Sequence, residues 1–214
     1  MIQQPEIILD KDNHNYYVDG KRKTSPTEVL GLVGVKNEKG YWNSISGSEH
    51  MSGTNCEFGN EFHSYTHYRC GLQVEPKKID YDSQMQPWID SIELWINKNK
   101  KFLDYTSASE VPIYSYNLDI CCTPDWVVFL PDGSCIVIDW KSSSQFMPHW
   151  LYQTGAYAGV VQEVYELRKL PEMWIIRPEP GKVADEYKSG YLESQIYFGK
   201  FRSIYNVYKM RKAA

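Results

Sequence analysis

The sequence lacks any long apolar run and any large excess of charge of one sign. No stretch approaches the roughly 20 apolar residues that span a bilayer, and residues 1–19 lack the basic-then-apolar layout of a signal peptide. We therefore expect a cytoplasmic protein with no membrane partner. Lys and Arg number 23 against 27 Asp and Glu, for a formal net charge of −4. By itself, this balance argues against a nucleic-acid partner.

Cysteine is also scarce, and no linker divides the chain. The five cysteines are odd in number and include the adjacent pair Cys121–Cys122, which does not fit a secreted disulfide framework. No internal repeat, low-complexity stretch or long Pro/Gly/Ser segment is present. We therefore expect a single domain over residues 1–214, with a hairpin and helix in 1–56, a core in 57–170, and a strand and helix in 171–214.

Aromatic residues are the one compositional excess, at 14% of the chain, with 17 tyrosines. In most proteins, tyrosine packs at the rim of the core. It can also stack on the bases of a single strand. Composition leaves both interpretations open.

Periodicity and turn residues predict an α/β chain with a mixed central sheet flanked by helices. An Asp-Gly turn at 19–20 predicts a hairpin over 15–22, and Ser25 can cap the short helix that follows. Further helices are expected over 57–70, 84–102, 148–168 and 194–212, and strands over 110–114, 125–130, 134–140 and 173–176.

One hairpin carries the strongest chemical signal. Pro131-Asp132-Gly133 suits a three-residue loop with glycine in the left-handed position. In the register that this loop sets, Asp125 lies directly opposite Asp139, with the two α-carbons roughly 4.5–5.5 Å apart. Lys141, two residues beyond Asp139, projects to the same face of the sheet.

Both faces of this hairpin are apolar, so we expect it in the centre of the sheet. Opposed carboxylates near a core destabilise a fold unless a cation lies between them. Their oxygens favour Mg²⁺ or Mn²⁺, and Lys141 could then position or deprotonate a water for attack on phosphorus. The alternative is two rim aspartates and a lysine that extends to solvent. The hairpin alone leaves both open.

The motif Pro124-Asp125 … Asp139-Trp140-Lys141 resembles the core of the PD-(D/E)XK nuclease superfamily, in its RecB-like exonuclease branch. Three further segments are similar, in the same order: Gly59-Asn-Glu-Phe-His63, Glu110 and Gln153-Thr-Gly-Ala-Tyr157. The opening segment 16–30 resembles phage-type members and the mitochondrial genome maintenance exonuclease group. The resemblance spans residues 16 to 205, and it implies a restriction-endonuclease-like core.

The resemblance also implies roles for these residues. His63, Asp125, Asp139 and the backbone carbonyl of Trp140 would hold Mg²⁺ or Mn²⁺. Lys141 would activate water, with Glu110 assisting beside the metal, and Gln153 and Tyr157 would contact DNA. Some relatives hold an iron–sulfur cluster through C-terminal cysteines, but this chain has no cysteine beyond Cys135, so we expect none.

The implied function is a divalent-metal-dependent DNA exonuclease that acts from DNA ends. Its setting would be phage or bacterial DNA processing and recombination, in the cytoplasm of a bacterial or phage-infected cell, with a replication or recombination protein as a possible partner. One alternative is a catalytically silent nucleic-acid-binding module of the same fold, and another is a structure-specific endonuclease. One departure stands out: many relatives have a glycine a few residues before the first aspartate, where this chain has Cys121-Cys122-Thr123.

Basic residues gather near both ends of the sequence. Two interpretations stay open for them, a solvated surface and a contact with a phosphate backbone, and for Lys200 we favour the solvated surface. A bound divalent cation would also reverse the sign of charge at the acidic hairpin. The net charge of −4 therefore does not exclude DNA. These residues are Lys21, Arg22, Lys23, Lys200, Arg202, Lys209, Arg211 and Lys212.

Overall fold

A computed structural model describes residues 2–10, 13, 15–32, 34–36, 42–44, 54–70, 85–143 and 145–213. Its centre is a five-stranded sheet in the order β12-β11-β10-β9-β6. Strands β10 and β11 are parallel and the other neighbours antiparallel, so the sheet is mixed, as predicted. Its strands are β6 (Ser107–Ser109), β9 (Trp126–Phe129), β10 (Cys135–Trp140), β11 (Glu172–Arg177) and β12 (Asp185–Lys188).

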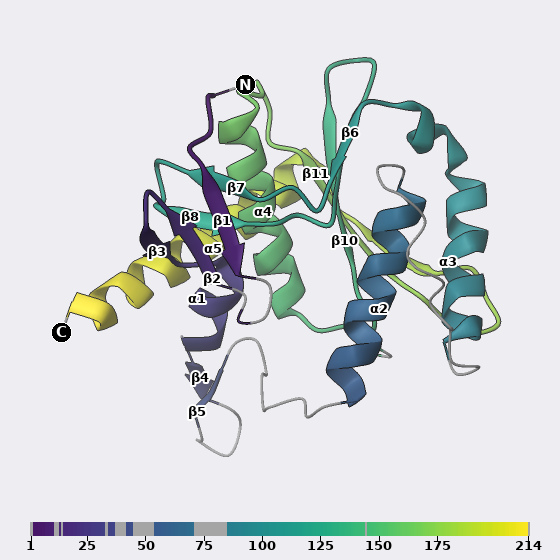
Figure 1. The fold of residues 1–214 in the computed structure, drawn as a ribbon, viewed down its shortest axis with the longest axis horizontal. Helices are drawn as coiled ribbons and strands as arrows, with labels where there is room; N and C mark the ends of the chain where they lie inside the picture. The colour runs from purple at the N-terminus through teal and green to yellow at the C-terminus, as the bar shows by residue number, and fades with distance from the viewer. Residues whose placement is uncertain are drawn as a thin grey trace.

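Helices cover both faces of this sheet (Figure 1). Helices α2 (Thr54–Arg69) and α3 (Gln86–Lys98) lie on one side, and α4 (His149–Val164) and α5 (Tyr191–Ala213) on the other. A 3₁₀ helix, η1 (Lys100–Asp104), follows α3. Within the described part of the chain, no helix has the length and apolarity that crossing a membrane requires.

The side chains of the central hairpin alternate between the two faces of the sheet, so the hairpin contributes to the hydrophobic core on each face. Val127 and Val137 pack with α4 and α5. Val128 and Ile138 belong to the opposite core, with α2 and α3. The expectation that both faces of the hairpin are buried is therefore confirmed.

Smaller elements surround this three-layer core. The predicted hairpin over 15–22 is present, and Asp19 and Gly20 have positive φ angles of 49° and 72° in its turn. Ser25 caps the helix after it, because the Glu28 N–H donates to Ser25 Oγ at 3.1 Å. The elements are β1 (Ile7–Asp10), β2 (Asn15–Val18), β3 (Lys21–Lys23), α1 (Pro26–Leu32), β4 (Gly34–Lys36), β5 (Trp42–Ser44), β7 (Ile113–Ser115) and β8 (Ile120–Cys122).

The strand expected over 110–114 is wrong in part. Residues 113–115 form β7, which pairs with β8 outside the central sheet, whereas β6 forms the sheet edge. Glu110 lies between β6 and β7 with a φ of 54°, and Pro112 has no N–H for a ladder. These two residues bend the chain away from the sheet, which leaves Glu110 at the end of β6.

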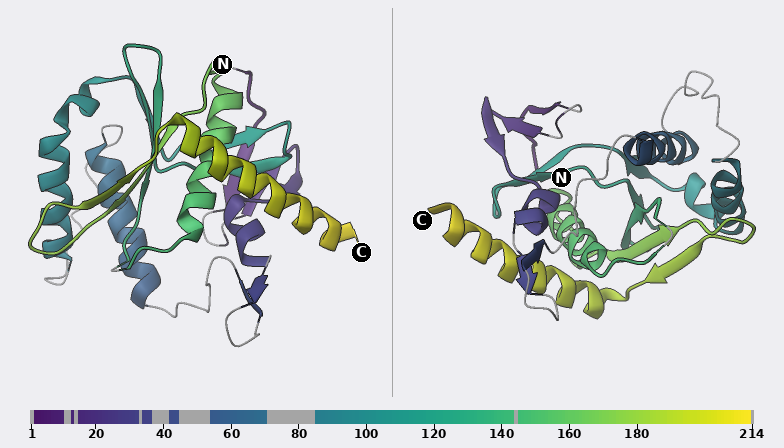
Figure 2. Two further views of the ribbon diagram at one scale, coloured as in Figure 1. Left: turned by 180° about the vertical axis from the view of Figure 1, so that it is seen from behind. Right: turned by 90° about the horizontal axis from the view of Figure 1, so that it is seen from below.

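Two glycines let α5 approach α4 closely. A Cβ added to Gly155 would lie 2.9 Å from the backbone of Tyr197, and one at Gly159 would lie 2.2 Å from the Phe198 ring. This face of α4 is therefore occupied by α5. As Figure 2 shows, α5 then continues past α4 toward α1 and the small N-terminal sheet.

Candidate active site

The candidate site lies where β6 and β10 end and β9 begins, and the hairpin register sets it. Leu130 N donates to Ser134 O at 2.9 Å, and Gly133 has a φ of 82° in the loop. Ile138 is paired with Trp126, so the next facing positions are 125 and 139, as predicted. Asp125 Oδ2 accepts the Trp140 N–H at 2.7 Å, which holds the two strands together at this end.

Three side chains from separate elements form a carboxylate–histidine cluster, defined as His63, Glu110 and Asp125. His63 comes from α2, Glu110 follows β6 and Asp125 precedes β9. His63 Nδ1 lies 3.6 Å from Asp125 Oδ2. One potential ligand atom from each of the three lies within 4.8 Å of the other two, close enough to share a metal ion.

Neighbouring polar groups support this cluster from behind. Ser109 Oγ donates to the Asp125 carbonyl at 2.9 Å, and the Glu110 N–H donates to the same oxygen at 3.2 Å. His67, one turn after His63, places Nδ1 2.7 Å from Ser109 Oγ. Neither Ser109 nor His67 was expected in the site from the sequence. The four-residue spacing of the two histidines was the only sequence signal for His67, and Ser109 had none.

Charge is poorly balanced around Asp125. Burial, followed by the charges of Asp139 and Glu110, raises the pKa of the Asp125 carboxyl well above its ordinary value. The Asp125 side chain is 12% exposed. Because the ionised form is disfavoured here, a cation at this position would stabilise it.

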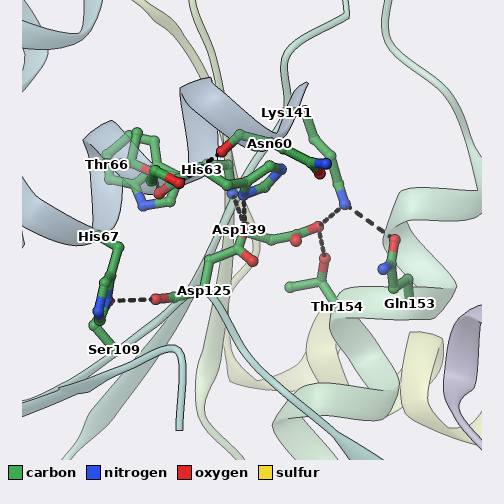
Figure 3. Close-up of polar contacts among 12 residues, drawn as sticks. Asn60, His63, Thr66, His67, Ser109, Asp125, Asp139, Lys141, Gln153 and Thr154 are labelled. Carbon is green, nitrogen blue, oxygen red and sulfur yellow. Dashed lines mark hydrogen bonds and ion pairs between the residues drawn. The ribbon is translucent and has the colours of Figure 1, made fainter. Parts of the chain in front are cut away.

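A second group, which we term the lysine network, contains Asp139, Lys141, Gln153, Thr154 and Tyr157. Lys141 Nζ lies 2.8 Å from Asp139 Oδ2 and donates to Gln153 Oε1 at 3.0 Å. Thr154 Oγ donates to the same Asp139 oxygen at 2.9 Å. Figure 3 shows these contacts beside Asp125 and His63. The Asp139 side chain is 2% exposed, so its charge is matched inside the protein.

Gln153 joins this network to two more elements. Its Nε2 donates to Tyr157 OH at 2.8 Å and to Thr27 Oγ of α1 at 3.2 Å. Tyr157 is buried, and burial raises the pKa of its hydroxyl. The contact of Gln153 and Tyr157 with DNA stays a prediction.

Two further expected ligands are placed as follows. Among the described residues, the group of potential ligand atoms consists of His63, Glu110 and Asp125 and does not include Asp139. Asp139 instead faces Lys141 and Thr154. Trp140 contributes its N–H to Asp125, and ligation by its carbonyl stays a prediction.

His149, at the start of α4, was not singled out from the sequence. Burial and then the charge of Lys141 lower its pKa to about 4. It is therefore neutral near pH 7, so it adds no positive charge beside Lys141.

No protein-family model and no curated protein matches this sequence. Among solved structures, a candidate exonuclease from Eubacterium rectale is similar at 10% identity and a TM-score of 0.45, over 75% of this chain and 70% of that chain. LHK-Exo, solved in complex with dAMP, is similar at 9% identity and a TM-score of 0.35, over 89% of this chain and 93% of that one. Because both TM-scores lie below 0.5, activity has to be argued from the site.

Proposed function

We propose that this chain is a divalent-metal-dependent deoxyribonuclease of the PD-(D/E)XK type that removes nucleotides from DNA ends. The observation that carries the proposal is the position of Lys141. It is paired with Asp139, and Asp139 lies across the hairpin from Asp125 and its cluster. A lysine and carboxylates arranged in this way suit hydrolysis of a phosphodiester.

The donor set of the cluster fits Mg²⁺ or Mn²⁺. Two carboxylates and one imidazole lie close enough to share an ion, and oxygen-rich sets with a histidine suit these hard or borderline cations. His63, Glu110 and Asp125 would hold the ion, with Asp139 and the Trp140 carbonyl as further candidates. A bound cation would supply Lewis-acid stabilisation of the charge that develops on the scissile phosphate.

The protein's own residues then have separate tasks. Asp139, Gln153 and the face of the Trp150 ring, 5.7 Å from Nζ, hold the Lys141 ammonium in one place. From there Lys141 orients a water for attack on phosphorus and neutralises charge on a phosphate oxygen. The new bond joins the water oxygen to phosphorus, and the bond to the departing nucleotide oxygen breaks. The attacking water loses a proton to solvent, and the departing oxygen takes one up from solvent.

End-labelled single- and double-stranded DNA, with covalently closed circular DNA beside them, test the proposal. We expect Mg²⁺ or Mn²⁺ to support cleavage of the linear substrates, EDTA to stop it, and the circle to stay intact. Lys141→Ala should lose most of the cleavage, while Lys200→Ala on the exposed face of α5 should match the wild type. Absence of metal-dependent cleavage by the wild type would indicate a silent binding module, and rapid opening of the circle would indicate an endonuclease.

A further inference from the structure

Basic residues from the two ends of the sequence meet on α1. Glu28 of α1 accepts a hydrogen bond from Arg22 Nη2 of β3 at 2.9 Å, and Lys212 Nζ of α5 lies 3.6 Å from the same carboxylate. Arg211 Nη1 donates to the carbonyl of Leu32, at the other end of α1, at 3.1 Å. In Figure 1, the C-terminal half of α5 passes α1 and β3. We call the exposed cations of β3 and of the last turns of α5 the basic surface: Lys21, Arg22, Lys209, Arg211 and Lys212.

Tyrosines of α5 hold this surface in place through hydrogen bonds and contacts with the cations. Tyr208, 5% exposed, places its hydroxyl 3.0 Å from Thr24 Oγ and 3.0 Å from Glu28 Oε1. Lys209 Nζ lies 4.8 Å from the centre of the Tyr205 ring, and Lys212 Nζ lies 5.5 Å from that of Tyr208. The cations therefore rest on aromatic rings, and Tyr208 ties the helix that carries them to α1.

The outward charge of this region is positive although the whole chain is acidic. The side chains of Arg22 and Lys212 are 46% and 55% exposed, whereas the Glu28 side chain that they share is 19% exposed. One carboxylate thus organises two cations from below and leaves them accessible. In a protein of net charge −4, such a concentration of cations is typical of a site for a polyanion.

Helix α1 connects this surface to the candidate active site. Thr27 accepts a hydrogen bond from the side chain of Gln153, which itself accepts one from Lys141. The next residue, Glu28, holds Arg22 and Lys212. One short helix therefore contacts the lysine network with one residue and the basic surface with the next.

We propose that the basic surface binds the phosphate backbone of the same nucleic acid, at a segment that lies outside the active site. The inference rests on the proposed function for the identity of the ligand. Lysines and arginines that contact phosphates release counterions, so they contribute affinity and salt dependence without selecting a sequence.

A matched pair of variants on α5 tests this role. Lys209→Gln/Lys212→Gln removes two charges from the basic surface. Lys200→Gln/Arg202→Gln removes two exposed charges from the same helix that also lie over rings, those of Tyr197 and Phe198. The test measures binding of a long labelled DNA by fluorescence anisotropy in EDTA over a range of KCl concentrations. The slope of the logarithm of the binding constant against the logarithm of the KCl concentration should become shallower by about two in the first variant only. Lys21→Gln on β3 should make this slope shallower by about one.

Cleavage measured beside binding separates the two proposals. If the wild type cleaves DNA in Mg²⁺ or Mn²⁺ while both double variants keep the wild-type salt slope, the basic-surface proposal is wrong and the nuclease proposal stands. If the wild type cleaves nothing and only the Lys209→Gln/Lys212→Gln and Lys21→Gln variants lose slope, the binding surface stands and the nuclease proposal is wrong. If both proposals are correct, the Lys209→Gln/Lys212→Gln variant cleaves long DNA more slowly than the wild type and cleaves a dinucleotide at the wild-type rate.

Discussion

The two facing aspartates of the central hairpin occupy opposite electrostatic environments. Asp139 is paired with Lys141 and accepts a hydrogen bond from Thr154, so its charge is matched within the lysine network. Asp125 meets a histidine and a second carboxylate, Glu110, in the carboxylate–histidine cluster. Burial, followed by the charges of Asp139 and Glu110, raises the pKa of Asp125.

This difference assigns separate tasks to two sides of one site. A carboxylate with an internal counter-charge is already organised, and its role is to hold the lysine. A buried carboxylate beside another carboxylate is stabilised when a cation arrives from outside. The fold therefore completes the lysine network by itself and leaves the cluster suited to a metal.

The sharpest test of this division compares Lys141→Ala with Asp125→Ala. We expect cleavage to fall by about 10²–10³-fold in Lys141→Ala, the usual range for losing a group that stabilises the charge developing in the transition state. Calorimetric titration with Mn²⁺ should show binding close to that of the wild type in Lys141→Ala and none in Asp125→Ala. Equal loss of Mn²⁺ binding in both variants would mean that the two groups are one metal site.

Stability in EDTA should separate the same two aspartates. Asp139→Asn leaves the Lys141 ammonium without its carboxylate, and breaking a largely buried pair from one side costs about 3 kcal/mol. Asp125→Asn removes a charge that two other carboxylates oppose, and its amide oxygen can still accept the Trp140 N–H. At pH 8, we expect the free energy of unfolding measured in urea to be lower than that of the wild type in Asp139→Asn. In Asp125→Asn we expect it to be unchanged or higher. A strong loss in Asp125→Asn would contradict the comparison.

Thr154 tests how much the lysine network depends on the buried hydroxyl that donates to Asp139. Thr154 is fully buried, and Thr154→Val keeps the shape while removing the donor to Asp139. Loss of one hydrogen bond to a buried charged group should cost about 1.5–3 kcal/mol and slow cleavage. Thr154→Ser keeps the hydroxyl and serves as the control. If urea unfolding shows the valine and serine variants to be equally stable, the hydroxyl does not hold Asp139.

The hairpin geometry was predictable because local chemistry sets it. The Pro131-Asp132-Gly133 loop selects the register, and the register determines that Asp125 and Asp139 face each other. Alternation then places Lys141 beside Asp139. Each step involves residues close in sequence, so this geometry does not depend on contacts between distant elements.

What the sequence did not reveal depends on contacts between distant elements. Strand β6, Ser-Ala-Ser, has no apolar pattern, and it is a strand because β9 pairs with it. Thr27 and Ser109 are small polar residues whose roles come from partners 126 and 16 positions away. The meeting of Arg22 and Lys212 on Glu28 likewise depends on the packing of α5 along α4.

The smallest expected effect is the pH dependence of the Asp125→Asn comparison. Because the folded-state pKa of Asp125 is raised, protonated Asp125 contributes stability in full below its ordinary pKa of about 4, and this contribution is lost as the pH rises toward and through the raised value. Glu93 changes in the opposite direction, since hydrogen bonds from Arg69 and Tyr65 outweigh partial burial and lower its pKa. It is present in both proteins, however, and cancels in the difference.

In EDTA, the two proteins should therefore be equally stable in acid, and the variant should gain on the wild type with rising pH by at most about 1.4 kcal/mol per pH unit. Urea unfolding at several pH values measures this difference. Saturating Mn²⁺ should reverse its sign at high pH, because only the wild type then gains the stabilisation that ion binding gives the folded state. A difference that does not vary with pH would mean that the pKa of Asp125 is not raised, and a difference unaffected by Mn²⁺ would mean that Asp125 does not hold the ion.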